Sequence, residues 1–125
     1  MPPYDKLLFA PPAPIARVVL HHPESQQSIR DVPMLIDSGA DATLLPRSAV
    51  MSLRLEGTGE RYQLVGFDGT ISESEAVQAS MALLRRNFLG RYLLTDAEFG
   101  VIGRDILNHL RLLLDGPAMN WEEQL

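Results

Sequence analysis

The 125-residue sequence contains no cysteine at all. This absence excludes a disulfide-stapled scaffold, a cysteine nucleophile, an iron–sulfur cluster and cysteine-ligated zinc. It is compatible with a reducing compartment, and we expect a cytoplasmic protein. We expect neither a metal nor another cofactor, because the pair His21-His22 with Glu24 has no well-placed third ligand.

Long hydrophobic runs and an excess of basic residues are missing too. The longest apolar runs are like Met81-Ala82-Leu83-Leu84, far short of the roughly 20 residues that a membrane-spanning helix needs. No basic segment followed by an apolar core opens the chain, so no signal peptide is expected. Eleven Lys and Arg against sixteen Asp and Glu leave a net charge of −5, whereas binding nucleic-acid phosphates needs a basic face. We therefore expect no membrane and no nucleic acid as partner.

The composition that remains is that of one ordinary globular domain, with 46% hydrophobic and 22% charged residues. It excludes intrinsic disorder of the whole chain. Five of the nine prolines lie in residues 1–14, which predicts an extended, Pro-rich N-terminal arm. Residues 15–116 are then the domain, and residues 117–125 a C-terminal tail or interface strand.

Short extended segments divided by turn residues predict a mostly β fold. Strands are expected at residues 15–20, 28–36, 61–65, 70–84, 91–95 and 112–114, with a loop at 56–60 and a turn at 87–90. Short helices are expected at 46–53, where Pro46 suits the first turn, and at 104–110. Asp68-Gly69 between two extended segments predicts a hairpin with a type I′ turn, whose central residues have positive φ.

The sharpest local feature is Leu35-Ile36-Asp37-Ser38-Gly39-Ala40. An apolar strand leads to a carboxylate in a turn, followed by a hydroxyl and by a glycine that permits close backbone approach. A carboxylate in such a setting can be held rigidly for chemistry. The alternative is an Asx turn, in which Asp37 and Ser38 only satisfy their own backbone.

A second signature, Val101-Ile102-Gly103-Arg104-Asp105, lies about sixty residues downstream, where an apolar pair and a glycine lead into a short helix. The hairpin tip Gly66-Phe67-Asp68-Gly69 lies between the two. In this order and spacing, the three segments resemble the retropepsin family, the single-lobe aspartic proteases of retroviral type. The resemblance covers residues 15–116 and implies a retropepsin-like acid protease fold: a closed, β-barrel-like single lobe with a flap hairpin and one or two short helices.

The resemblance also implies roles for individual residues. Asp37 would be catalytic, and the rest of the active-site loop would be Ser38, Gly39, Ala40 and Asp41. The flap tip would be Gly66, Phe67, Asp68 and Gly69, and the structural support Val101, Ile102, Gly103 and Arg104.

Some of these roles have plain alternatives. The Ser38 hydroxyl would bond the opposite subunit's loop, or only its own turn. Asp41 and Arg104 would pair beneath the site, or be two solvated charges. Phe67 would cover the substrate, unless the hairpin is exposed and has no lid function.

Aspartic proteases of this kind use two aspartates that share a proton and activate water. This chain has one Asp-Ser-Gly, so the second carboxylate must come from another copy. The first hypothesis is therefore a homodimeric aspartic endopeptidase acting on peptide or protein substrates. The alternative is a non-catalytic retropepsin-like peptide-binding or dimerisation module. Either Arg111–Leu114 or Ala118–Gln124 could form the interface, and the apolar segment Leu7-Leu8-Phe9-Ala10 raises the hypothesis of self-cleavage in the arm.

Overall fold

The computed structural model describes residues 1–66 and 68–125, so Phe67 lies outside the described residues. The strands are β1 (Tyr4–Asp5), β2 (Ala13–His21), β3 (Ser28–Ile36), β4 (Leu44–Pro46), β5 (Gly57–Val65), β6 (Ile71–Leu83), β7 (Arg86–Thr95), β8 (Gly100–Ile102), β9 (Leu112–Asp115) and β10 (Asn120–Glu123). The helices are α1 (Arg47–Ser52) and α2 (Arg104–Leu107). In the described part of the chain, no helix is long and apolar enough to cross a membrane.

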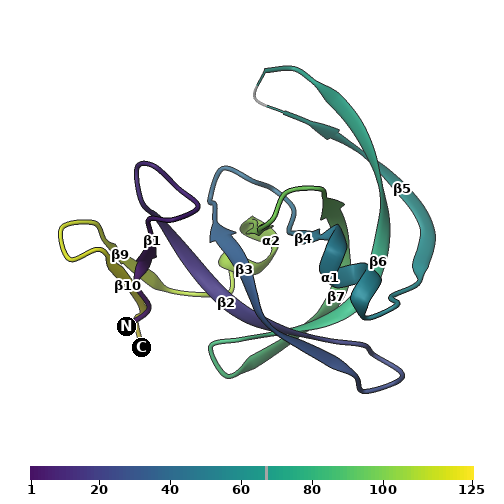
Figure 1. Ribbon diagram of the computed structural model, residues 1–125, viewed down its shortest axis with the longest axis horizontal. Coiled ribbons are helices and arrows are strands. Elements are labelled where there is room, and N and C mark those ends of the chain that lie inside the picture. Colours follow the sequence, from purple (N-terminus) through teal and green to yellow (C-terminus); the bar gives the residue numbers. More distant parts are fainter. Residues whose placement is uncertain (67) are drawn as a thin grey trace.

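One sheet of eight strands curls into a ring (Figure 1). The strand order is β1-β2-β3-β8-β4-β7-β6-β5, and an additional pairing of β2 with β6 closes the ring. Most neighbours are antiparallel, but β3 runs parallel to β8, and β4 runs parallel to β7. The expected mostly β fold with a barrel-like ring is therefore confirmed.

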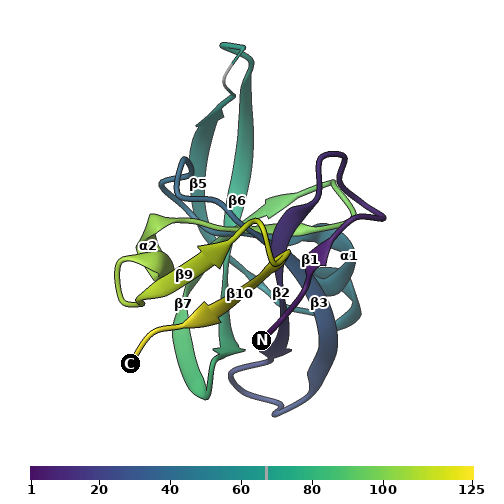
Figure 2. The same cartoon turned by 90° about the vertical axis from the view of Figure 1, so that its left-hand side faces the viewer.

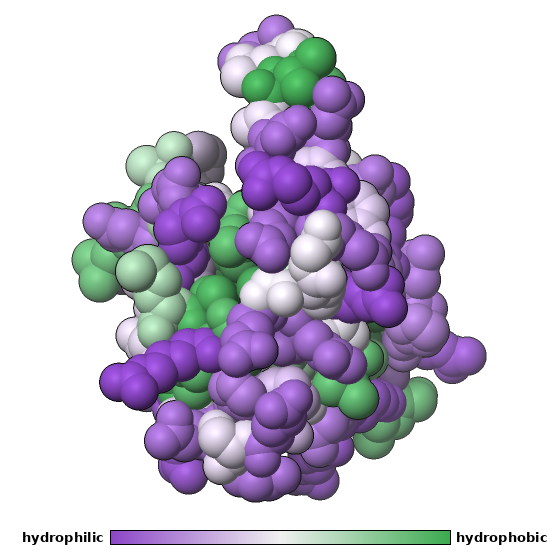
Figure 3. Space-filling view, turned by 90° about the vertical axis from the view of Figure 1, so that its right-hand side faces the viewer, coloured by the Kyte–Doolittle hydropathy of each residue, from purple (hydrophilic) through white to green (hydrophobic). Residues whose placement is uncertain are grey.

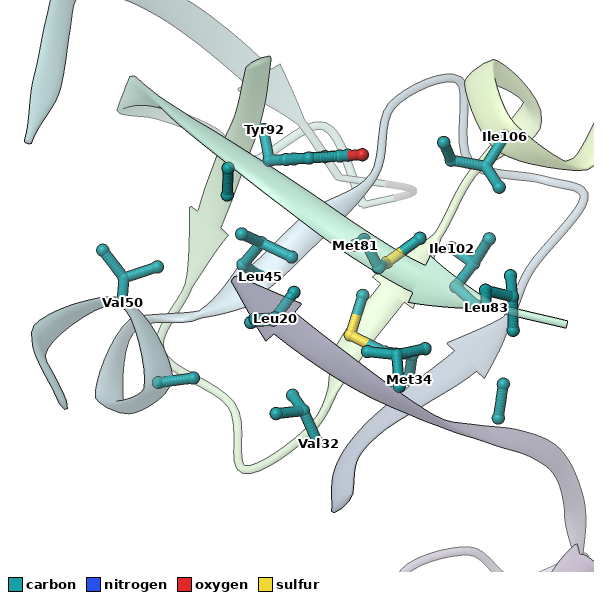
Figure 4. Packing of buried hydrophobic residues seen from close by; sticks show 14 of the residues in the cluster. Leu20, Val32, Met34, Leu45, Val50, Met81, Leu83, Tyr92, Ile102 and Ile106 are labelled. Carbon is teal, nitrogen blue, oxygen red and sulfur yellow. The ribbon is translucent and has the colours of Figure 1, made fainter. Parts of the chain in front are cut away.

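The core inside the ring follows from the alternation of apolar residues along the strands. In β2, Val18 and Leu20 are fully buried, whereas Arg17 is exposed, as the two-residue period of a strand requires. Figure 4 shows side chains from several strands meeting in this core. Those that are completely buried include Met34, Leu45, Met81 and Ile102. The core therefore includes the ends of β3 and β8, from which the candidate site is built.

The turn between β6 and β7 lies earlier than expected. The sequence predicts it at residues 87–90, but the turn residues are Leu84 and Arg85, which both have positive φ. Residues 86–90 instead pair with residues 79–83 of β6. Pairing along a long strand has overridden the local turn preference of asparagine and glycine.

Two further boundaries differ from the prediction. The segment 56–60 is mostly strand rather than loop, because β5 already begins at Gly57. A register shift between Gly57 and Arg61 accommodates this irregular start. The second helix is shorter than the predicted 104–110 and ends at Leu107.

The N-terminal segment is extended, as expected, but it also pairs with the sheet. Tyr4 and Asp5 of β1 lie opposite Pro14 and Ala13 at the start of β2. Pro14 is tolerated there because it lies near the start of β2, one residue before the pairing of β2 with β3 begins at Ile15. The segment thus folds back on the domain.

The C-terminal residues form a separate hairpin of β9 and β10, beside the N-terminus (Figure 2). The outer edge of β10 is occupied by the N-terminal segment: Pro3 bridges Asn120, and the Trp121 N–H donates to the Pro2 carbonyl at 3.0 Å. Trp121 is 2% exposed, and its indole Nε1 donates to the Ile15 carbonyl at 3.0 Å. This side chain ties the hairpin to β2.

Candidate active site

Asp37 follows β3 directly and begins the loop that leads to β4. Its backbone N–H donates to the Ile102 carbonyl at 3.1 Å, and its own carbonyl accepts the Ala40 N–H at 3.1 Å. Its side-chain Oδ1 accepts the Gly39 N–H at 2.9 Å. The Asx turn considered as the alternative is therefore present, and it fixes a carboxylate that also lines a cleft.

Arg104 braces this loop from the start of α2. Its backbone N–H donates to the Ala40 carbonyl at 2.8 Å, and its Nη1 donates to the Ser38 carbonyl at 2.8 Å. The expected pairing of Asp41 with Arg104 is wrong, since no ion pair joins them among the residues that the structure describes. The guanidinium binds a backbone carbonyl instead, and Asp41 remains exposed at the cleft.

A buried polar contact, absent from the sequence-based prediction, holds the other end of the loop. Thr43 is 1% exposed, and its hydroxyl donates to Asp105 Oδ1 at 2.6 Å. The Thr43 N–H donates to Asp105 Oδ2 at 3.1 Å, while its Oγ1 accepts the Gly103 N–H at 3.1 Å. A polar residue beside the apolar Leu44 and Leu45 was the only sequence signal for this contact.

Gly103 lies where the two signature segments approach closely. A Cβ atom at this position would lie 2.6 Å from the Ala42 carbonyl oxygen and 2.7 Å from its carbonyl carbon. Both are backbone atoms, so no side-chain movement could make room. Val101 and Ile102 contribute through β8, where they pair with the last two residues of β3.

The hairpin predicted to be the flap consists of β5 and β6 and projects away from the ring (Figure 1). Val65 pairs with Ile71, and the Gly66 N–H donates to the Thr70 carbonyl at 2.8 Å. The Gly69 N–H donates to the Gly66 carbonyl at 3.0 Å, which puts Gly69 at the end of the turn. The predicted type I′ turn, with Gly69 at its centre, is wrong in this detail, although Gly69 does have a φ of 83°.

Charged and polar side chains connect the base of the flap to β7, and a further contact joins Asp68 and Thr70 at its tip. Arg91 of β7 pairs with Glu60 of β5, whose Oε2 also accepts the Tyr62 hydroxyl at 2.5 Å. The bond from Tyr62, with the charge of Arg91, lowers the pKa of Glu60, and Glu60 in turn raises the pKa of Tyr62. Hydrogen bonds from the Thr70 side chain and backbone lower the pKa of Asp68.

A cleft of about 720 Å³ lies between the active-site loop and the flap. Five predicted residues meet in its lining, namely Asp37, Gly39, Ala40, Asp41 and Gly66. The other predicted residues that the structure describes lie outside the lining and are Ser38, Asp68, Gly69, Val101, Ile102, Gly103 and Arg104.

Most residues of the cleft wall were not predicted from the sequence. From the flap strands, the wall contains Gln63, Leu64, Val65, Thr70, Ser72 and Glu73. On the side of β4 and β7 it contains Ala42, Leu44, Arg47, Leu94, Thr95, Asp96 and Ala97. There, Arg47 Nε lies 2.7 Å from Asp96 Oδ1. No local pattern joins two residues so far apart in sequence, because the pairing of β4 with β7 brings them together.

The flap exposes apolar surface near its tip (Figure 3). Val65 and Ile71 are 69% and 63% exposed. Apolar residues that gather at one exposed place often mark a surface that a partner covers. Because Val65 also lines the cleft, a molecule bound in the cleft is the candidate for covering this surface.

Nothing in the described residues forms a group of three or more His, Cys, Asp or Glu placed to hold a metal ion. His22, considered above as a ligand, accepts the backbone N–H groups of Glu24 and Ser25 on its Nδ1, each at 3.1 Å. Its ring therefore serves the turn between β2 and β3.

Comparisons with known proteins identify the family and the fold. The profile of the family described as retroviral aspartyl protease matches residues 14–115. No curated protein matches the chain in sequence. Among solved structures, the chain is similar to EIAV protease complexed with the inhibitor HBY-793, with a TM-score of 0.59 and 23% identity, over 84% of this chain and 91% of that chain. At this identity the likeness concerns the fold, which is the one implied by the three sequence segments.

Proposed function

The chain belongs to the retroviral aspartyl protease family, and we propose that it is a homodimeric aspartic endopeptidase whose water is activated between two Asp37 carboxylates, one from each subunit. The placement of Asp37 carries this proposal. The carboxylate is fixed by the Gly39 N–H at the start of a braced loop, and it lines a cleft that a hairpin borders on the other side. That arrangement suits chemistry on a chain held between loop and flap.

Hydrolysis at such a site needs two carboxyl groups that share one proton. Adjacent carboxylates repel one another, so one member of the pair stays protonated. The ionised member accepts a proton from the water that attacks the scissile carbonyl carbon. The protonated member polarises the carbonyl oxygen, and a proton then passes to the leaving amine.

The second carboxyl group is proposed to come from a second copy of the chain. The other acidic residues described in the cleft lining are Asp41, Glu73 and Asp96, and none of them is hydrogen-bonded to Asp37. Asp96 is already paired with Arg47. A two-fold axis beside Asp37 would bring two equivalent, equally braced carboxylates together.

The free edge of β9 supports a dimer formed through the C-terminal hairpin (Figure 2). β10 has neighbours on both sides, whereas β9 has one partner strand in the described structure. Leu113 and Leu114 on β9 are 45% and 49% exposed. An unpaired edge with exposed apolar side chains favours pairing with another chain, so we choose Arg111–Leu114 over Ala118–Gln124 as the interface strand.

Ser38 is available for a contact between subunits. It is exposed, and its hydroxyl makes no hydrogen bond within the described part of the chain, while Arg104 holds its carbonyl. Ser38→Ala should therefore weaken the dimer by about 0.5–1.5 kcal/mol for each hydrogen bond lost and leave the monomer fold intact. Analytical ultracentrifugation would measure this as a higher dissociation constant, and an unchanged constant would remove the proposed role.

The proposed substrate is an extended peptide or protein segment with apolar side chains near the scissile bond. A β hairpin beside the cleft offers backbone groups to an extended chain. Leu44, Leu64 and Leu94 provide apolar wall, and the exposed Val65 and Ile71 of the flap would be covered by bound substrate. A cytoplasmic location remains part of the proposal.

A subunit-mixing experiment tests the shared site. Wild-type and Asp37→Asn chains are mixed in equal amounts, unfolded and refolded together, and assayed on a peptide library with mass-spectrometric mapping of the cuts. Asn is close to Asp in shape, so subunits should pair at random and only wild-type homodimers should be active. Activity should fall to about one quarter of an all-wild-type sample at the same total concentration.

Two other outcomes would contradict the proposal in different ways. Activity near one half, with mass spectrometry confirming that mixed dimers formed, would mean that each chain works alone. No cleavage by wild-type chains that still form dimers and bind peptides would favour the non-catalytic module. Asp37→Asn homodimers serve as the control and should lack activity, because the amide cannot accept the proton from water.

A further inference from the structure

The four residues between β7 and β8, Asp96 to Phe99, form a loop that we call the wall loop. Asp96 and Ala97 line the cleft. Among the described residues, no backbone-to-backbone hydrogen bond outside the strands involves this loop, and its one local bond runs from the Ala97 N–H to Thr95 Oγ1 at 3.2 Å. Between the two strands that fix its ends, the loop is therefore held mainly by side-chain contacts.

Each end of the wall loop has one such contact. At the first end, Asp96 pairs with Arg47 from the start of α1. At the other end, Phe99 packs against Phe9, with ring centroids 4.6 Å apart and an interplanar angle of 59°. That spacing and tilt lie in the range of favourable aromatic pairs. Both rings are partly buried although both residues lie in loops.

Phe9 belongs to the segment between β1 and β2, which has a defined structure of its own. Asp5 Oδ1 accepts the N–H groups of Leu7 and Leu8 at 2.9 and 2.8 Å. Asp5 Oδ2 lies 3.5 Å from Arg17 Nη2 of β2. These contacts anchor the segment at its base, and it lies beside the wall loop (Figure 2).

We propose that Phe9 is a positioning residue for substrate binding: through Phe99 it holds the wall loop against the cleft. This inference rests on the proposed protease function. A peptide lying in the cleft would meet Asp96 and Ala97, so a loose wall loop must be ordered when substrate binds. The N-terminal segment is thus a working part of the enzyme, and self-cleavage within Leu7-Leu8-Phe9-Ala10 would separate Phe9 from its anchor and weaken binding.

The test is a kinetic double-mutant cycle on a peptide that the wild-type dimer cleaves. Phe9→Ala should raise KM by about 2- to 10-fold, the range that loss of one aromatic pair represents, with kcat nearly unchanged. Phe99→Ala should do the same, and the double variant should be no worse than either single variant. Phe9→Tyr keeps the ring and should stay close to wild type.

Leu7→Ala is the matched control, because Leu7 lies in the same segment and is 92% exposed. Thermal unfolding and sedimentation of every variant separate a binding effect from loss of fold or dimer. An unchanged KM for Phe9→Ala, additive effects in the cycle, or an equal rise with Leu7→Ala would overturn the inference while leaving the protease function in place. Absence of cleavage by wild type would overturn the proposed function, and this inference with it.

Discussion

The active-site loop and the flap border the same cleft, but they are held in opposite ways. The loop is fixed by buried or backbone contacts: Thr43 bonds Asp105 and Gly103, and Arg104 holds two carbonyls of the loop. The flap is held by its own strand pairing and by exposed charges such as Glu60 and Arg91. Contacts inside a close-packed core cost far more to break than exposed ion pairs.

This difference suits the proposed hydrolytic function. A catalytic carboxylate needs a fixed position, whereas a flap must move aside for substrate to enter. Substitutions in the loop should therefore disturb both fold and activity, and substitutions in the flap should disturb activity alone. The four predictions below test this contrast in order of decreasing effect.

Gly103→Ala should have the largest effect. The added Cβ would lie 2.6 Å from the Ala42 carbonyl oxygen, so the two signature segments would have to separate. We expect a loss of about 1–3 kcal/mol or more in the free energy of unfolding, with loss of cleavage. Gly116→Ala is the control, because nothing lies within 4 Å of its Cβ position. Urea denaturation would measure both, and equal stabilities would contradict the close contact.

Thr43→Val should have the second largest effect, a loss of stability. It removes the hydroxyl that donates to Asp105 and accepts from the Gly103 N–H, and so leaves the buried Gly103 N–H unpaired. The expected loss is about 1–3 kcal/mol in the free energy of unfolding. Thr58→Val, on exposed β5, is the control and should change stability by about 0.5 kcal/mol or less. A Thr43 variant as stable as this control would show that the buried contact does not hold the loop.

Gly69→Val should separate activity from stability. Its φ of 83° is costly for a branched side chain, although the position has room for a Cβ. A strain of about 1–2 kcal/mol in the closed flap corresponds to a loss of about 5- to 30-fold in kcat/KM. The flap projects away from the ring and can relieve this strain locally, so the midpoint of thermal unfolding should fall less than for Gly103→Ala. Gly116→Val is the unstrained control. A large drop in the unfolding midpoint with normal turnover would reverse the proposed contrast between loop and flap.

Tyr62→Phe should have the smallest effect, confined to the base of the flap. The Tyr62 hydroxyl is the main cause of the lowered pKa of Glu60, so its removal should raise that pKa toward the ordinary carboxyl value. A lowered pKa means that the Glu60 contacts stabilise the fold above the unfolded-state pKa, and that this contribution is lost as pH falls through the folded-state pKa. An NMR titration of the Glu60 side chain would show the change. An unaltered pKa would assign the shift to Arg91.

The sequence was most informative for features whose structure is determined by the residue types within one short segment. Asp37, its Asx turn and the hairpin at Gly66 to Gly69 follow from local residue types, and the structure has them at the expected places. A mostly β fold could be predicted from short extended segments and turn residues, and a barrel-like closure from the family resemblance; both are confirmed.

What could not be predicted depends on contacts between distant segments. The bond of Thr43 to Asp105 spans 62 residues, and the pair of Arg47 with Asp96 spans 49. The Arg104 side chain was expected to pair with the carboxylate of Asp41, but it donates to the backbone carbonyl of Ser38 instead. The turn between β6 and β7 was predicted at residues 87–90 rather than at Leu84 and Arg85, because the pairing of β7 with β6 determines where β7 begins.

The parallel pairing of β3 with β8 has a consequence for how the protein is made. On one side, residues 34 and 35 pair with β2, but on the other side residues 34–36 pair with residues 100–102, so the strand that leads to Asp37 lacks one neighbour until most of the chain exists. Contacts this far apart in sequence form late in folding and slow it. Because synthesis runs from the N-terminus, a partly made chain already contains Asp37 but lacks the segment that fixes it. For the proposed protease, the site would be complete only after β8 and α2 have been synthesised, so an unfinished chain would not yet be able to cut its neighbours.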